Sequence, residues 1–200
     1  MTFTRFALPV LPTRRWDLVA LGLLFAALYA LDRGLGLGLG EVLSVEKGRT
    51  LHQPWRLLGY VLVQPDAWKA VGVAASVPVG LTMVVRSCGG WTAWGGALAG
   101  TLLGGLLAWW WQDVPRLGAA SLVYTALGMA AVAWFRMREE LTYARRVDWI
   151  AGFGTLLLVL AALGMPLLMK QPFHPEYLAT SILGGAVVAL SPRHYTSVMR

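Results

Sequence analysis

Two serines and a tyrosine in the apolar stretches have hydroxyl groups that could take part in catalysis. Ser121 and Tyr124 lie one helical turn apart in the stretch 118–135, and Ser181 lies in the stretch 177–190. A serine hydroxyl becomes a nucleophile only when an adjacent base accepts its proton. Neither stretch contains a histidine. We therefore expect Ser121 to bond a backbone carbonyl or a neighbouring helix, and Tyr124 either to bond Ser181 or simply to pack.

Metal and cofactor chemistry finds little support in the sequence. The three histidines, His52, His174 and His194, lack the spacing of metal ligands, and the single Cys88 excludes an internal disulfide or a cysteine zinc site. No glycine-rich phosphate loop follows a strand pattern. We predict no metal and no cofactor.

Two charged pairs are expected near the ends of apolar stretches. Lys69 is predicted to reach the outer membrane interface beside Asp66, rather than to act as a buried charge. Arg116 and Asp113 could pair across a short loop. An exposed pair of that kind contributes under about 1 kcal/mol.

Composition places the chain in a membrane. Of its 200 residues 57% are hydrophobic and 14% are charged, whereas soluble domains carry about 25% charged residues. The apolar residues form blocks close to the length that spans a bilayer. The net charge of +7 comes from basic residues between these blocks, which indicates membrane topology rather than nucleic-acid binding. We predict one integral membrane domain over residues 1–200, with lipid as a partner and no nucleic acid.

Six apolar segments are predicted to span the bilayer, which makes the fold class an all-α polytopic membrane protein. They cover residues 18–31, 67–85, 91–111, 118–135, 149–169 and 177–190, and Asp66 is the expected N-cap of the second segment. The long first loop, 32–57, mixes charges with leucines and valines, so we expect it to lie half embedded in the interface. Residues 1–15 and 191–200 form the terminal segments.

The orientation follows from the basic residues. The loop 136–148 holds Arg136, Arg138, Arg145 and Arg146, and such loops remain in the cytoplasm. With six spans, both termini are then cytoplasmic. We expect a bacterial inner (cytoplasmic) membrane.

Small residues predict where helices pack closely. Gly96, Gly100 and Gly104 recur every four residues along one face of the third segment. Without side chains there, another helix can approach closely. We expect this face to be a packing surface.

The order of several motifs resembles the rhomboid family of intramembrane serine proteases. Gly118, Tyr124 and Gly128 match the family pattern Gly-x-Ser-Gly-x-x-Tyr-x-x-x-Gly, and Trp55-Arg56 follows a long first loop as in that family. The resemblance covers roughly residues 16–193. It implies a six-helix rhomboid-like bundle with a half-embedded first loop.

The catalytic positions of the family are replaced in this chain. The nucleophile position falls on Ala120, followed by Ser121 where the family has glycine. The family pattern His-x-x-Gly falls on Ser181 to Gly184, and the two oxyanion-stabilising positions fall on Lys69 and Val73. The resemblance therefore implies a catalytically inactive pseudoprotease.

We expect the chain to bind, stabilise or assemble partner membrane proteins through their transmembrane helices, as a subunit of a larger membrane complex. One alternative is an active intramembrane protease that uses Ser121 with an unexpected base. A second alternative is a small transporter or channel, although the predicted spans hold few of the ionisable residues that ion pathways need.

Overall fold

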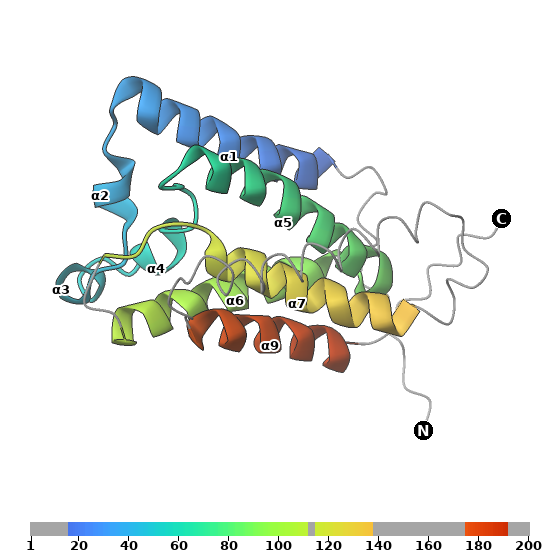
Figure 1. Ribbon diagram of the computed structural model, residues 1–200. Helices are drawn as coiled ribbons and strands as arrows, with labels where there is room; N and C mark the ends of the chain where they lie inside the picture. The colour runs from blue at the N-terminus through green and yellow to red at the C-terminus, as the bar shows by residue number, and fades with distance from the viewer. Residues whose placement is uncertain (1–15, 112–114, 138–174, 192–200) are drawn as a thin grey trace, which may run out of the picture.

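The computed structural model describes residues 16–111, 115–137 and 175–191, which form the helices drawn in Figure 1. The helices are α1 (Trp16–Leu35), α2 (Leu39–Leu43), α3 (Lys47–Thr50), α4 (Arg56–Gly59), α5 (Ala67–Cys88), α6 (Gly90–Trp111), α7 (Ala120–Met137) and α9 (Pro175–Leu190). Within these ranges no strand forms, and one isolated β-bridge joins Val45 to Arg116. The mostly helical architecture is therefore confirmed.

Five of the six predicted segments coincide with long helices, namely α1, α5, α6, α7 and α9. The predicted segment 149–169 and the terminal segments 1–15 and 192–200 lie outside the described residues. Among the described helices, Trp16–Leu35 and Ala67–Val85 are long and apolar enough to cross a membrane. The apolar stretches of α7 and α9 are shorter, and α6 is rich in tryptophan and glycine. Two apolar helices favour membrane association but do not confirm six spans.

The first loop contains more helix than the sequence suggested. The first helix continues to Leu35 and ends where Gly36 and Gly38 adopt positive φ angles of 62° and 64°, a backbone conformation that glycine adopts readily. The Asp32 carboxylate accepts a hydrogen bond of 2.8 Å from the Leu39 amide and fixes this turn. The short helices α2, α3 and α4 follow and gather at one end of the bundle (Figure 1).

Helices α7 and α9 run in the same direction. Arg116, just before α7, pairs with Glu176 in the first turn of α9. At the other end, Arg136 in the last turn of α7 donates to the carbonyls of Val188 and Ser191. The end of α7 and the start of α9 therefore lie at opposite ends of the bundle.

Helix α5 is parallel to this pair, and α6 is antiparallel to it. The Gln64 side chain, just before α5, bonds the Ala119 amide at the start of α7. The Cys88 sulfur, at the end of α5, contacts the Arg136 guanidinium 3.7 Å away. In contrast, glycines early in α6 face the end of α7, and later ones face its start.

The three glycines of α6 pack against α7 as predicted. A Cβ atom at any of them would collide with an α7 side chain: Gly96 faces Met129, Gly100 faces Thr125 and Gly104 faces Ser121. The same applies to α7 and α9, because a Cβ at Gly128 would overlap the Ser181 carbonyl. The α6 glycines thus make room for side chains of α7, and Gly128 lets α7 approach the backbone of α9.

Helix α1 packs on α5 beside a proline. Pro78 has no amide hydrogen, so the Ala74 carbonyl lacks its usual partner within the helix. Gly22 of α1 lies against that carbonyl, since a Cβ there would be 2.7 Å from the Ala74 oxygen. The two helices run side by side in Figure 1, in opposite directions, because Arg33 at the end of α1 donates to Pro65 before α5 over 2.5 Å.

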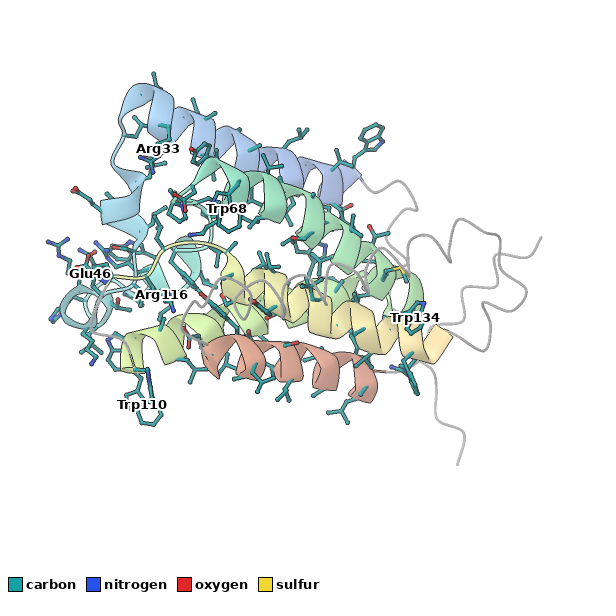
Figure 2. All side chains as sticks on the ribbon, in the orientation of Figure 1. Arg33, Glu46, Trp68, Trp110, Arg116 and Trp134 are labelled. Atoms are coloured by element: carbon teal, nitrogen blue, oxygen red, sulfur yellow. The ribbon has the colours of Figure 1, made fainter. Side chains whose placement is uncertain are left out.

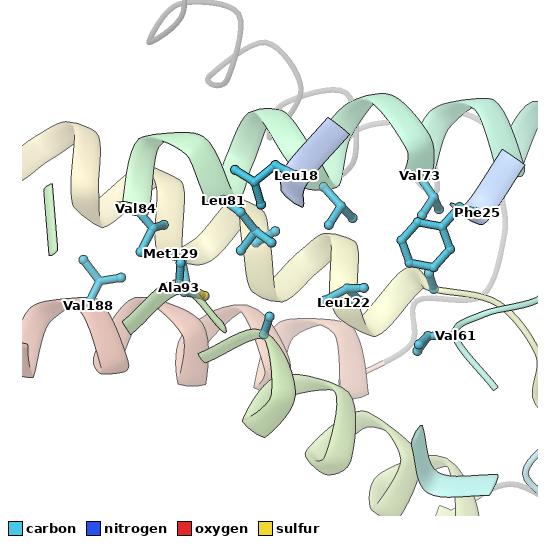
Figure 3. Close-up of a cluster of buried hydrophobic side chains, with 14 of the residues drawn as sticks. Leu18, Phe25, Val61, Val73, Leu81, Val84, Ala93, Leu122, Met129 and Val188 are labelled. Atoms are coloured by element: carbon cyan, nitrogen blue, oxygen red, sulfur yellow. The ribbon is translucent and has the colours of Figure 1, made fainter. Parts of the chain in front are cut away.

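The buried core runs between the layers of helices. Figure 3 shows Leu18 and Phe25 from α1 facing Val73 and Leu81 of α5, with Leu122 of α7 below them. Burial of these side chains supplies the main drive for packing in water, whereas in lipid the close fit of the side chains replaces it.

The start of α5 shows one local difference from expectation. Asp66 has the extended backbone of an N-cap residue, but its side chain makes no capping hydrogen bond. Its carboxylate pairs with Lys69 instead, at 2.9 Å, and both side chains are roughly half exposed. The Lys69 ammonium also lies 5.3 Å from the Trp68 ring centroid. Lys69 therefore lies beside Asp66 as expected, and its position at a membrane interface stays a prediction.

Candidate functional site

The segment before α7 is held between two parts of the chain. Val45 and Arg116 exchange two backbone hydrogen bonds of 2.9 and 3.0 Å, and the Gly118 amide donates to the Tyr60 carbonyl over 2.8 Å. Gly118 has a φ angle of 111°, which other residues rarely adopt. Glycine at this position therefore has a conformational reason, because the backbone turns here into α7.

A buried glutamine fixes the first turn of α7. Gln64 is 2% exposed. Its amide nitrogen donates to the Val61 carbonyl over 2.8 Å, and its oxygen accepts the Ala119 amide over 3.1 Å. Because both ends of the side chain are satisfied, Gln64 acts as a fixed spacer between the segment 60–65 and α7.

Arg56 stabilises the first loop from inside. The residue is 3% exposed, and its guanidinium donates to the Gln53 side chain over 2.6 Å and to the carbonyls of Ser44 and Glu41 over 2.7 and 3.0 Å. The neighbouring Trp55 is exposed. Since one cation ties together α2, α4 and their connection, Arg56 has a structural role in the described loop.

A small cavity lies where the segment before α7 meets α6 and α9. Its volume is about 20 Å³, and its lining includes Tyr60, Arg116, Ala120, Ser121, Glu176 and Tyr177. They include Ala120 and Ser121, the residues that the resemblance compares with a nucleophile and its neighbour. Arg116 marks this end of the bundle in Figure 2, close to the short helices of the first loop.

The Ser121 hydroxyl is engaged in packing. Ser121 is 3% exposed and shares a short hydrogen bond with the Tyr60 hydroxyl. Tyr60 has one proton, and it donates this proton to the Thr101 carbonyl over 3.1 Å. Ser121 is therefore the donor in its bond to Tyr60. The Ser121 carbonyl also accepts the Thr125 hydroxyl over 2.7 Å, so hydroxyl groups connect α6, α7 and the segment after α4.

Tyr60 is a poor candidate for a base. Burial raises the pKa of its phenol well above the usual value, and the bond from Ser121 only partly opposes this effect. A neutral phenol whose proton already goes to a carbonyl does not accept a second proton from serine. Ser121 thus bonds a neutral phenol, which is far too weak a base to activate a serine hydroxyl.

Histidine does not approach Ser121 in the part of the chain that is described. The histidine found there, His52, lies in the exposed turn after α3. His174 and His194 lie outside the described residues. A protease that uses Ser121 stays a hypothesis.

The α9 residue beside the cavity is Tyr177 rather than Ser181. The Tyr124 and Tyr177 rings stack with centroids 4.8 Å apart and planes 6° apart, so Tyr124 packs against an aromatic ring. Ser181, the expected base position, lies one turn further along and rests against Gly128. Gly184 faces Thr125 in the same way. The position opposite Ala120 is thus filled by a phenol ring.

An ion pair lines the cavity. Arg116 and Glu176 lie 2.6 Å apart, with side chains 23% and 6% exposed. The guanidinium carbon is also 5.7 Å from the Tyr177 ring centroid. Asp113, the expected partner of Arg116, lies outside the described residues. The pair joins the segment before α7 to the first turn of α9.

The two expected oxyanion positions do not line this cavity. Lys69 is paired with Asp66 at the surface, and Val73 is 5% exposed within the apolar core. Neither can direct a donor toward Ala120. The described residues contain no group of three or more His, Cys, Asp or Glu side chains that could hold a metal.

Sequence reasoning missed the polar residues that build the cavity. Tyr60, Glu176 and Tyr177 stand at the edges of apolar segments, where polar residues are normally solvated. One signal was present for Glu176, an acidic residue in the first turn of an apolar helix. Its pairing with Arg116, 60 residues away, could not be read from sequence spacing.

Comparison of the chain with protein-family models, curated proteins and solved structures finds no match.

Proposed function

We propose that this chain is a non-proteolytic, rhomboid-like membrane protein that binds and stabilises the transmembrane helices of partner proteins within a larger complex. The observation that carries the proposal is the arrangement around Ala120. The side chain at the position compared with the nucleophile has no hydroxyl, and the adjacent Ser121 hydroxyl is hydrogen-bonded to Tyr60, a neutral phenol and a very weak base. A site of this kind can hold a structure together, but it offers no activated nucleophile.

A six-span arrangement fits the directions of the described helices. Helices α1 and α6 run one way, and α5, α7 and α9 run the other way. The end of α7 and the start of α9 lie at opposite ends of the bundle, and the predicted segment 149–169 between them lies outside the described residues. With cytoplasmic termini in an inner membrane, the cavity and the half-embedded first loop then lie at the outer side.

Helix α5 offers a face suited to a partner helix. Trp68, Val71 and Val79 are 65%, 69% and 40% exposed, and a Cβ at Gly72 would meet nothing within 4 Å. Lipid-facing and partner-facing surfaces are both apolar, but small residues favour contact between helices. We assign this face to partner binding.

Site-specific photo-crosslinking in native membranes tests the assignment. A benzophenone amino acid replaces Val71 or Val79 on the α5 face, and Leu98 on α6 serves as the matched exposed control at 51% exposure. We expect a discrete protein adduct from the α5 positions and mainly lipid adducts from Leu98. Lipid adducts alone at all three positions, together with purification as a lone monomer, would contradict partner binding.

The protease alternative has its own test. Ser121 lines the cavity, so residual reactivity is worth measuring. A fluorophosphonate probe is applied to the wild-type chain and to Ser121→Ala in membranes. We expect no labelling of either chain. Labelling that disappears with Ser121→Ala would establish an active serine.

A further inference from the structure

We propose that α6 crosses the bilayer with its exposed face against lipid acyl chains and with Trp91 and Trp110 in the two headgroup layers. Overall composition does not identify α6 as a membrane-crossing helix, since Trp16–Leu35 and Ala67–Val85 are the described segments that meet that criterion. The case for α6 comes from how its residues divide between a buried and an exposed side. The inference rests on the proposed membrane location, but not on partner binding through α5.

Glycines fill much of the buried side of α6. Gly96, Gly100 and Gly104 are buried, and a Cβ at each would collide with an α7 side chain. Gly105 is also buried, and a Cβ there would lie 2.7 Å from the Leu57 carbonyl oxygen. Because lipid meets only the outer side of a helix, these glycines lower the mean hydropathy of α6 without contacting lipid. Their number therefore does not count against a bilayer crossing.

The exposed side of α6 is a continuous apolar face. Its residues follow one another at intervals of three or four positions, which places them on one side of the helix. They are Trp91, Gly95, Leu98, Leu102, Leu106 and Trp110. The two tryptophans are 65% and 74% exposed, and α6 contains no Asp, Glu, Lys or Arg. The face is therefore apolar along the whole helix, with an indole at each end.

The distance between the two end tryptophans matches the thickness of a bilayer. Trp110 lies nineteen positions after Trp91, which corresponds to about 28 Å at the helical rise of 1.5 Å per residue. The hydrocarbon core of a bilayer is about 30 Å thick. Tryptophan gathers at both boundaries of this core, because its ring is apolar and its N–H is polar.

The middle of the face favours lipid over a partner helix. Contacts between helices in membranes are rich in small residues, as at the exposed Gly72 of α5. On α6, leucines occupy the middle of the face at positions 98, 102 and 106, and Gly95 lies beside Trp91 near one end. A partner helix would also not require tryptophans at the spacing of a bilayer. Composition and length thus indicate the same occupant.

Aromatic residues on other helices lie at the same two ends. Trp68 at the start of α5 is 65% exposed, and Figure 2 shows it at the same end of the bundle as Trp110. Trp109 donates its indole N–H to the Lys47 carbonyl over 3.2 Å, so polar backbone of the first loop borders this end of the face. Near the end of α7, at the other end of the bundle, Phe135 is 56% exposed.

Site-directed spin labelling measures what surrounds the face. Single nitroxides are attached to Trp91→Cys, Leu98→Cys, Leu106→Cys and Trp110→Cys in the full chain, with little background because Cys88 is 1% exposed. In dioleoyl phosphatidylcholine vesicles, collisions are measured with oxygen, which concentrates in lipid, and with a water-soluble nickel complex. Leu98 is the closest of the four to the middle of the helix. We expect the ratio of oxygen to nickel collisions to be highest there, lower at Leu106 and several-fold lower than at Leu98 at both ends.

Two controls separate failure of this inference from failure of the membrane location. Arg49→Cys, on a side chain that is 61% exposed in the first loop, reports water, and Leu23→Cys on the exposed side of α1 reports lipid. Nickel collisions at Leu98 equal to those at Arg49 would overturn the inference, as would low collisions of both reagents at Leu98 and Leu106, or equal ratios along α6. A lipid signal at Leu23 would then preserve the membrane location, whereas water at both Leu23 and Leu98 would contradict it as well.

Discussion

Glycines of the same helix have different roles, depending on what surrounds them. In α6, a Cβ at Gly100 would overlap the Thr125 side chain, but a Cβ at Gly95 would meet nothing within 4 Å. The first glycine is required by contact with α7. The second carries only the conformational cost that glycine brings to a helix.

Alanine substitution separates these two roles. We expect Gly100→Ala to lower the free energy of unfolding by about 1–3 kcal/mol, because the added methyl forces α6 and α7 apart. The control Gly95→Ala is expected to raise it by about 0.5–1 kcal/mol. Both values are measured by denaturant titration in one lipid–detergent mixture. Equal destabilisation by both substitutions would contradict the packing role of Gly100.

The hydroxyl of Tyr60 makes stability sensitive to alkaline pH. Burial raises the pKa of the folded phenol above its usual value of 10.0. The folded state then holds a proton that the unfolded state releases, so stability is complete below about pH 10 and falls as the pH rises further. Tyr60→Phe lacks this titration.

Comparison of the two chains isolates the effect. At pH 8 we expect Tyr60→Phe to be less stable by about 1–2 kcal/mol, because the bonds to Thr101 and Ser121 are lost. Between pH 10 and 11.5 the difference is expected to shrink. Thermal unfolding across this range is the measurement, and a constant difference at all pH values would show that Tyr60 is not the titrating group.

Residue-scale patterns explain why the sequence predicted the helices but not the cavity. The spacing of Gly96, Gly100 and Gly104 identified a packing face, because steric demands repeat with the helical period. The register between separate helices has no such signal. The expected base position Ser181 rests against Gly128, and Tyr177 takes the place beside Tyr124. The residue expected beside Tyr124, Ser181, and the residue found there, Tyr177, are one turn of α9 apart.

At the scale of elements, one arginine side chain binds each end of α9. Arg116 pairs with Glu176 at its start, and Arg136 bonds the carbonyls of Val188 and Ser191 at its end. The last carbonyls of a helix have no partner within it. Arg136 therefore caps α9 from a neighbouring helix, at the opposite end of the bundle from Arg116.

A double-mutant cycle measures the coupling energy of the ion pair between Arg116 and Glu176. Arg116→Met and Glu176→Gln are each expected to cost about 1–3 kcal/mol, since each leaves a largely buried polar partner. The double variant should cost less than the sum of the two, by about 1 kcal/mol or more. Additive effects in denaturant titration would mean that the pair contributes no net coupling.

Removal of the hydrogen bonds from Arg136 should destabilise only the end of α9. Arg136→Met is expected to increase amide exchange at Val188 and Ser191, because the end of α9 loses its external donors. The exposed Arg49 provides the control, and Arg49→Met should leave exchange at these amides unchanged. Hydrogen–deuterium exchange with mass spectrometry gives the readout. Unchanged amide exchange in Arg136→Met would show that Arg136 does not cap α9.

At the scale of the whole molecule, helix direction predicts which side of a membrane each connection faces. Leu37, after α1, and Pro115, before α7, lie at one end of the bundle, and Ser191, after α9, lies at the other end. Cys88 is 1% exposed, so the wild-type chain provides a background with little labelling.

Sided labelling with an impermeant maleimide tests this prediction. We expect Leu37→Cys and Pro115→Cys to react from the periplasmic face of intact cells, and Ser191→Cys to react only after the cells are opened. Reaction of all three from the same face would exclude a bundle that crosses the bilayer in the proposed orientation.

The shared direction of α5, α7 and α9 places three helix N-termini at the same end of the bundle. Each helix carries a macrodipole equal to about half an elementary charge at either terminus, so negative charge is favoured beside an N-terminus and positive charge beside a C-terminus. Asp66 stands at the start of α5 and Glu176 in the first turn of α9. The Arg136 guanidinium stands in the last turn of α7. Each of these charges therefore has the sign that the nearby helix end favours.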